Sequence, residues 1–166
     1  MLIAVISDTH MPRGRRRLPL ERLRDADLIL HAGDFVTESV LEELEAVGPP
    51  VAGVYGNMDE AALRARLPEL RVVAAGGVRI GMVHDAGPAR GRLERLRRRF
   101  PDADAVVFGH SHVPLHEERG GFQIFNPGSA TDRRRQPRHT MGLARVEKRA
   151  VRFEGAVRFD LVDLEA

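Results

Sequence analysis

The apolar positions of the chain fall into short runs that end abruptly at glycine, aspartate, asparagine or histidine. The first run, 2–6, is continuously apolar, as expected for a central strand that is covered on both faces. Runs at 27–34, 51–55 and 106–108 end in the same way and predict three further strands. Residues 37–47 instead have a helical period, with one apolar stripe and glutamates on the opposite face.

The remaining patterns predict short helices and antiparallel pairs of strands. Helices are predicted at 18–24, 61–67 and 88–100. Antiparallel pairs are predicted at 70–75 with 78–83, 113–117 with 122–125, and 141–147 with 150–161. The polar, arginine-rich segment 131–139 is expected to form a mobile loop. Strands that alternate with helices and then give way to hairpins predict an α/β fold, and no linker or repeat divides residues 1–166, so we expect a single domain.

The composition narrows the class of protein. Apolar residues make up 43% of the chain and charged residues 30%, which is typical of a globular protein. There is no cysteine, so any metal ion must be held by nitrogen and oxygen ligands. No stretch approaches the roughly 20 apolar residues of a membrane span, and the first apolar run is too short for a signal peptide. We therefore expect a soluble cytoplasmic protein without a membrane partner.

The basic residues give little sign of a nucleic-acid partner. The net charge is only +2, and the chain has one Tyr and no Trp. A protein that binds a nucleic-acid polymer needs a long basic track with stacking aromatic rings, which is not evident here. The basic loop 12–17 is expected to be solvated rather than to steer phosphate toward a site.

Candidate chemistry begins at the end of the strand at 106–108, where Gly109 is followed by His110, Ser111 and His112. Two histidines one residue apart at a strand end lie on one face, and Gly109 allows close approach of the backbone. Two converging imidazoles suit a transition metal such as Mn, Fe, Ni or Zn. The alternative to a metal site is a pair of ordinary loop histidines. The residue types at the other strand ends decide between these two interpretations.

The other strand ends deliver the same kinds of residue. Together the strand ends supply Asp8, His10, Asp34, Asn57, His84, His110 and His112. Seven ligands are too many for one ion with an open position, but they suit two ions that share a bridging carboxylate. Two metals about 3.5–4 Å apart can clamp the attacking and leaving oxygens of a displacement at phosphorus, and can lower the pKa of a shared water. His31 lies inside its run and is expected to be a packed core residue or to support a ligand rather than to be one, while His116 and His139 are ordinary by default.

This ordered series resembles the motifs of the calcineurin-like metallophosphoesterases. The motifs are Asp8-x-His10, Gly33-Asp34, Gly56-Asn57, His84 and Gly109-His110-Ser111-His112, and Asn126-Pro127-Gly128-Ser129 together with the short length resembles the small bacterial and archaeal phosphodiesterase branch. The resemblance implies a sandwich of two mixed β-sheets flanked by helices. It also implies two divalent ions, with Mn expected first and Fe, Ni or Zn as alternatives.

The resemblance assigns each candidate residue a place. One ion would be held by Asp8, His10, Asp34 and His112, and the other by Asp34, Asn57, His84 and His110. Asp34 would therefore be the bridge, and Asn57, Asp34 and His10 are the residues that we count as catalytic.

The expected function is that of a metal-dependent phosphodiesterase. A hydroxide that bridges the two metals would attack the phosphorus of a small phosphodiester, and nucleotides are the natural substrate class that we expect. One alternative is a non-catalytic scaffold, because the family includes the small subunit of the retromer sorting coat, which has an altered metal site. Another is a nuclease that acts on polymer. A homo-oligomer is compatible with the sequence.

Two departures from the family pattern bear on mechanism. Many members have a histidine after the Gly-Asn pair, where it can protonate the leaving group, but here that residue is Met58, whose thioether cannot donate a proton. Since general acid catalysis contributes about 10²–10⁴-fold, we predict a strong preference for good leaving groups unless another acid stands in. Asp85 stands where glycine is expected, and we interpret it as a turn residue rather than an orienting partner of a histidine.

Arginines that could contact a substrate phosphate follow the Asn-Pro-Gly-Ser motif. A guanidinium matches the geometry of a phosphate group. The candidates are Arg133, Arg134, Arg135 and Arg138, and the sequence does not decide among them.

Overall fold

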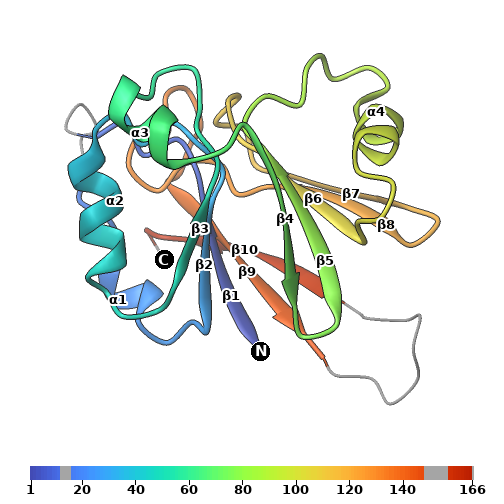
Figure 1. Cartoon of the computed structure of the whole chain (residues 1–166), viewed down its shortest axis with the longest axis horizontal. Helices are drawn as coiled ribbons and strands as arrows, with labels where there is room; N and C mark the ends of the chain where they lie inside the picture. Colours follow the sequence, from blue (N-terminus) through green and yellow to red (C-terminus); the bar gives the residue numbers. More distant parts are fainter. Residues whose placement is uncertain (12–15, 148–156, 166) are drawn as a thin grey trace.

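Two five-stranded sheets face each other in the computed structural model, which describes residues 1–11, 16–147 and 157–165 (Figure 1). The first sheet has the order β10 (Val157–Asp163), β9 (Thr140–Val146), β1 (Leu2–Ile6), β2 (Leu28–His31) and β3 (Val51–Gly53). The second has the order β4 (Leu70–Ala75), β5 (Val78–Val83), β6 (Ala105–Val107), β8 (Phe122–Asn126) and β7 (Leu115–Arg119). Each sheet contains parallel and antiparallel pairs, so the predicted fold of two mixed sheets is confirmed.

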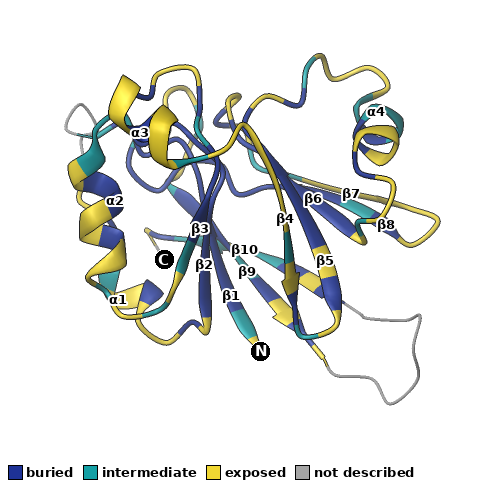
Figure 2. Ribbon diagram, in the orientation of Figure 1, coloured by how far each residue is buried: buried dark blue, intermediate teal, exposed yellow. Residues whose placement is uncertain are grey.

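Helices cover the outer faces of both sheets (Figure 1). The first sheet is covered by α1 (Leu20–Leu23), α2 (Glu38–Glu45) and α3 (Ala61–Arg66), and the second by α4 (Arg92–Arg99). The amphipathic pattern predicted for 37–47 accounts for α2, whose apolar stripe is buried while Glu42, Glu43 and Glu45 are exposed. Figure 2 shows this helix with buried and exposed parts.

Alternation along each strand divides the core into three layers. In β1, Ile3 and Val5 point between the two sheets, whereas Ala4 and Ile6 point toward the helices that cover the first sheet. Strand β6 is divided in the same way, since Ala105 and Val107 point between the two sheets and Val106 points toward α4. Apolar side chains on both faces explain why these strands are continuously apolar in the sequence.

The parallel strands place the site. Strands β1, β2 and β3 are parallel in one sheet, and β5, β6 and β8 are parallel in the other. The strands of a parallel set end at the same edge of their sheet, and these ends lie toward the top of Figure 1. The loops after β1, β2, β3, β5 and β6 carry all seven candidate ligands, so the packing of the two sheets brings two rows of polar strand ends together.

Several predicted boundaries are corrected. The helix predicted at 88–100 begins only at Arg92, because Gly91 has a left-handed backbone with φ +66° that interrupts the helix. The strand predicted from Val113 begins at Leu115. The final strands are antiparallel as predicted, but residues 150–156 of the strand predicted at 150–161 lie outside the described part of the chain. Segment 131–139, every residue of which is described, contains neither helix nor strand.

Within the described ranges, no helix has both the length and the apolar character that crossing a bilayer requires.

Candidate metal centre

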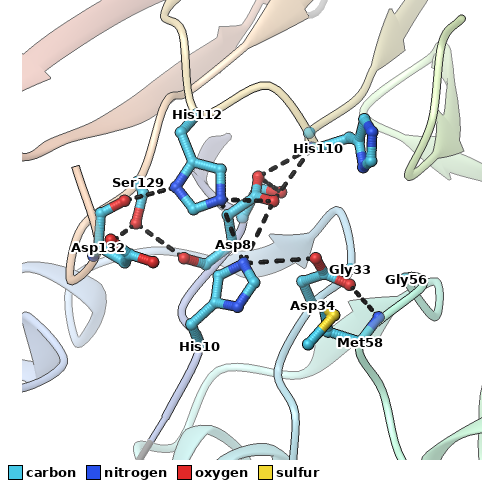
Figure 3. A network of polar contacts seen from close by, with 12 residues as sticks. Asp8, His10, Gly33, Asp34, Gly56, Met58, His110, His112, Ser129 and Asp132 are labelled. Carbon is cyan, nitrogen blue, oxygen red and sulfur yellow. Dashed lines mark hydrogen bonds and ion pairs between the residues drawn. The ribbon is translucent and has the colours of Figure 1, made fainter. Parts of the chain in front are cut away.

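The loops that carry the candidate ligands have an uncommon backbone conformation. Asp8, His10 and Asp34 have φ values of 54°, 46° and 60°, and His110 and His112 have values of 68° and 58°. Residues other than glycine rarely adopt this left-handed region, and they cluster at functional sites when they do. Each of these strands therefore turns sharply at its end. The side chains of Asp8, His10, Asp34 and His112 point toward one another, whereas the ring of His110 points away from Asp8 (Figure 3).

Asp34 lies at the middle of the assembled site. Its Oδ2 atom is 3.3 Å from Nε2 of His10 and also 3.3 Å from Nε2 of His84. Its Oδ1 atom accepts a hydrogen bond of 2.8 Å from the backbone N–H of Met58, which fixes the orientation of the carboxylate (Figure 3). An oxygen between two imidazoles is where a bridging ligand would have to be, and the bridging role itself stays a prediction.

One group of candidate ligands surrounds His10. Nε2 of His112 lies 3.1 Å from Nε2 of His10 and 3.5 Å from Oδ1 of Asp8. Ligand atoms of these three buried residues all lie within 4.8 Å of one another. The backbone N–H of His110 donates to both carboxylate oxygens of Asp8, at 3.1 and 3.0 Å, so Asp8 is held by the loop that carries the two histidines.

The other group surrounds Asn57. Its Oδ1 atom lies 3.1 Å from Nε2 of His84 and 3.0 Å from Nδ1 of His110. Asp8, Asp34 and His84 also offer ligand atoms that lie within 4.8 Å of one another, which joins this group to the first. All seven candidate residues are therefore brought to one place.

The orientation of two histidines fits a metal centre. Nδ1 of His84 lies 2.7 Å from the carbonyl oxygen of Ala32, and Nδ1 of His112 hydrogen-bonds the carbonyl oxygen of Asp132. A histidine that donates its Nδ1–H to a carbonyl keeps Nε2 available as a ligand. The complete donor set of two carboxylates, one amide and four imidazoles, without a thiolate, suits divalent ions such as Mn, Fe, Ni and Zn.

The charges in the site are coupled. Burial lowers the pKa of His84, but the hydrogen bond to Asp34 and the charges of Asp8 and Asp34 outweigh burial and raise that pKa to about 9. Burial favours the neutral form of Asp34, yet the hydrogen bond and charge of His84 hold the pKa of Asp34 below its ordinary value. Without metal, an imidazolium therefore neutralises the carboxylate, and a cation that binds here replaces the proton.

Asp59 is a site residue that the sequence reasoning missed. Its buried carboxylate accepts hydrogen bonds from the backbone N–H groups of Asp34 at 3.1 Å, Val36 at 2.7 Å and Gly56 at 2.7 Å. Burial raises the pKa of Asp59, against the effect of these hydrogen bonds. Asp59 thus joins the loop of Asp34 to the loop of Asn57. An Asp two residues after Gly-Asn looks like an ordinary turn residue, so the sequence offers no separate signal for this role.

The Asn-Pro-Gly-Ser loop supports the site from behind. The side-chain amide of Asn126 donates to the carbonyl of Gly109 at 2.9 Å, and the hydroxyl of Ser129 donates to the carbonyl of Asp8 at 2.8 Å (Figure 3). The prediction that Gly109 allows close approach of the backbone is confirmed, because a Cβ atom at this position would lie only 1.9 Å from Oγ of Ser7. The Asn-Pro-Gly-Ser motif therefore holds the loops that carry Asp8 and Gly109 in place.

Two further interpretations are settled by contacts. His31 is fully buried, stacks on Phe35 with ring centroids 3.5 Å apart, and has Nε2 3.2 Å from Oγ1 of Thr9. Burial, and then the charge of His84, lower the pKa of His31 to about 3, so it is a neutral core residue as predicted. Asp85 accepts a hydrogen bond of 2.7 Å from the backbone N–H of Gly87, as expected for a turn residue.

The candidate phosphate-binding arginines differ in their contacts. Arg133 donates to the carbonyl of Gln136, and Arg138 forms an ion pair with Asp163. Burial, and among the smaller influences the charge of Arg134, lower the pKa of His112. Nε of Arg134 lies 3.8 Å from Oδ2 of Asp132, and its role toward phosphate stays a prediction.

Comparison with known proteins agrees with this arrangement. The sequence profile described as "Calcineurin-like phosphoesterase superfamily domain" matches residues 1–149. A probable metallophosphoesterase of Methanothermobacter thermautotrophicus is 38% identical over 136 residues, which cover 79% of this chain and 78% of that protein. A phosphodiesterase of Methanocaldococcus jannaschii is 25% identical over 141 residues, which cover 77% of this chain and 83% of the relative. The crystal structure of wild-type Vps29 of Entamoeba histolytica in complex with Zn²⁺ is similar with a TM-score of 0.76 and 27% identity, and covers 98% of this chain and 99% of that one.

Proposed function

Because the chain belongs to the calcineurin-like phosphoesterase superfamily, we propose that it is a metal-dependent phosphodiesterase that acts on small phosphodiesters, with nucleotides as the natural class. The observation that carries the proposal is the position of Asp34, one oxygen of which lies 3.3 Å from an imidazole of each ligand group. The relative named as a phosphodiesterase supports the choice of diesters over other phosphoesters.

The proposed division of labour follows the two ligand groups. Asp8, His10, Asp34 and His112 would hold one divalent ion, and Asp34, Asn57, His84 and His110 the other, with manganese as the proposed metal. When bound, such a pair supplies hydroxide near neutral pH and neutralises the charge that develops on the phosphoryl oxygens. Hydrolysis then adds water across one P–O bond and yields a phosphomonoester and an alcohol.

Exposed side chains at the candidate metal centre would orient the substrate. Asn57 and His110 are exposed, whereas the other five candidate ligands are buried, so substrate would approach from the side of Asn57. The amide of Asn57 has both an acceptor oxygen and a donor nitrogen, and it can therefore contact a cation and a phosphate oxygen together. Met58 is 42% exposed beside the site but has no proton to give, so the leaving group must depart without its help.

Asp34→Ala tests the proposal. The wild-type protein should hydrolyse bis(4-nitrophenyl) phosphate only with added Mn²⁺ or a similar ion, and the variant should have no measurable activity. Asp102→Asn is a matched control, because Asp102 is an exposed carboxylate that precedes β6, at the opposite end of this strand from His110. An Asp34→Ala variant as active as the wild-type protein would overturn the proposal. A screen of monoesters, diesters and cyclic nucleotides against several metals would then define the substrate.

A protein-binding scaffold is the second candidate function. The similarity to Vps29 structures favours it, since the full name of Vps29, Vacuolar Protein Sorting 29, concerns sorting rather than catalysis. The complete set of seven ligand-type residues in this chain favours an enzyme. A metal-loaded protein with no turnover on any phosphoester would decide for the scaffold.

A further inference from the structure

A cleft of about 240 Å³ continues outward from the candidate metal centre, on the side of Asn57, His84 and His110. We propose that this cleft is a subsite for one ester arm of the substrate, and that it selects an arm with a neutral, planar aromatic group. The inference rests on the proposed function, since it assigns the part of the phosphodiester that lies next to the phosphorus.

The position of the cleft follows from its lining. Asn57, His84 and His110 are the three residues of the second ligand group other than the shared Asp34, and all three contribute to the wall. A phosphate held at this group therefore has one of its ester oxygens directed toward the cleft. The volume is below the roughly 300–1,000 Å³ of sites for drug-sized ligands, so the cleft accommodates one small ring system rather than a polymer.

Tyr55 provides an aromatic wall. The chain contains one Tyr and no Trp, and this Tyr lines the cleft directly before the Gly56-Asn57 pair. Its backbone N–H donates to the carbonyl of Pro68 at 3.1 Å, which fixes the start of the loop. An aromatic ring held in this way offers a stacking surface to a planar ligand group.

Arg64 keeps the tyrosine ring in place. Its guanidinium carbon lies 5.0 Å from the centroid of the Tyr55 ring, and its nitrogens donate to the carbonyls of Asn57 at 2.9 Å and Asp59 at 2.9 Å. Because the guanidinium is committed to these carbonyls, it is a fixed part of the wall rather than a free cation. A planar group that enters the cleft therefore meets a ring and a guanidinium that are already ordered.

The charges around the cleft balance. Its lining contains two arginines, Arg64 and Arg99, and two carboxylates, Glu69 and Asp85. Arg99 and Glu69 also pair with each other across 3.2 Å. With the arginines engaged and the carboxylates present, the cleft gives no net attraction to an anionic arm, and an aryl or nucleoside group fits better than a second phosphate. Aryl groups also leave readily, which suits a site where Met58 cannot act as an acid.

The experiment measures binding of phenyl phosphate and methyl phosphate to the Mn²⁺-loaded protein by isothermal titration calorimetry. Tyr55→Leu should weaken the binding of phenyl phosphate about two- to tenfold, from the loss of an aromatic pair, and should leave that of methyl phosphate unchanged. Tyr55→Phe, the matched control, should bind both as the wild-type protein does. An equal effect on both ligands, or no effect on either, would overturn the assignment.

Glu69→Gln tests the charge balance independently, because Glu69 is exposed on the rim and is not a candidate ligand. The variant should bind 4-carboxyphenyl phosphate about two- to fivefold more tightly than the wild-type protein does, with phenyl phosphate unchanged. No improvement would place the ring outside the cleft. Calorimetry requires no turnover, so the two failures are distinguishable: a protein that binds as expected but hydrolyses no phosphodiester would refute the proposed function, whereas an active enzyme in which Tyr55→Leu binds phenyl phosphate and methyl phosphate as the wild-type protein does would refute the subsite alone.

Discussion

Replacement of Asp59 by alanine should destabilise the fold and also disturb the second ligand group. The carboxylate accepts three backbone hydrogen bonds, from Asp34, Val36 and Gly56, and all three N–H groups lose their partner in Asp59→Ala. We count each bond at the ordinary net value of about 1 kcal/mol for a protein hydrogen bond. The expected loss in the free energy of unfolding is about 3 kcal/mol.

Asp59→Asn should lower the free energy of unfolding by less than Asp59→Ala does, because asparagine has nearly the same shape as aspartate. Oδ2 accepts from Asp34 and Gly56, whereas Oδ1 accepts only from Val36. An asparagine oxygen in the Oδ2 position preserves two bonds, and its NH₂ group then faces the N–H of Val36. The expected loss is therefore about 1–2 kcal/mol, from one unpaired N–H.

The assay is urea unfolding in the presence of a chelator, followed by calorimetric titration with Mn²⁺. Two sites are expected in the wild-type protein, and Asp59→Ala should lose or weaken the site that depends on Asp34 and Asn57. Asp104→Ala is the matched control, because Asp104 also accepts a backbone hydrogen bond, from Arg79 at 2.7 Å, but is exposed. If Asp59→Ala lost no more stability than this control and bound metal normally, the proposed link between the two loops would be wrong.

Three further predictions follow from the same site. The pKa of His84 is raised to about 9, so His84 is protonated at pH 7 and metal binding should release about one proton. Proton release is measured from the dependence of the calorimetric heat of binding on the ionisation enthalpy of the buffer. The His84→Ala variant should release about one proton fewer than the wild-type protein. Gly109→Ala should impair metal binding, because its Cβ atom would lie 1.9 Å from Oγ of Ser7, and a variant with normal metal affinity and melting temperature would contradict the close approach. Met58→His should raise the rate for substrates with poor leaving groups by up to about 10²-fold. If the rate of the wild-type protein hardly changed with the pKa of the leaving group, the claim that it lacks a general acid would be wrong.

Much of the fold was predictable because its signals are local. The continuous apolar run of β1 and the Gly-Gly turn between β4 and β5 each depend on neighbouring residues, and both elements have the predicted bounds. The start of α4 was predicted too early, because the apolar pattern of 88–100 carries no signal for the left-handed backbone of Gly91, where the helix is interrupted. The candidate ligands were likewise found from local spacing, such as the i, i+2 pair of His110 and His112.

The sequence by itself determined which residue types stand at the strand ends, that no thiolate takes part, and the family to which the chain belongs. Tertiary structure alone decided that Asp34 lies between His10 and His84, that Asp59 joins two loops, and that Tyr55 and Arg64 wall a cleft. The physical reason is the range of the interactions. Side-chain direction along a strand repeats every two residues and can be read from the chain, whereas contacts between the two sheets join residues about 50 positions apart, as between Asp34 and His84, and depend on how the sheets pack.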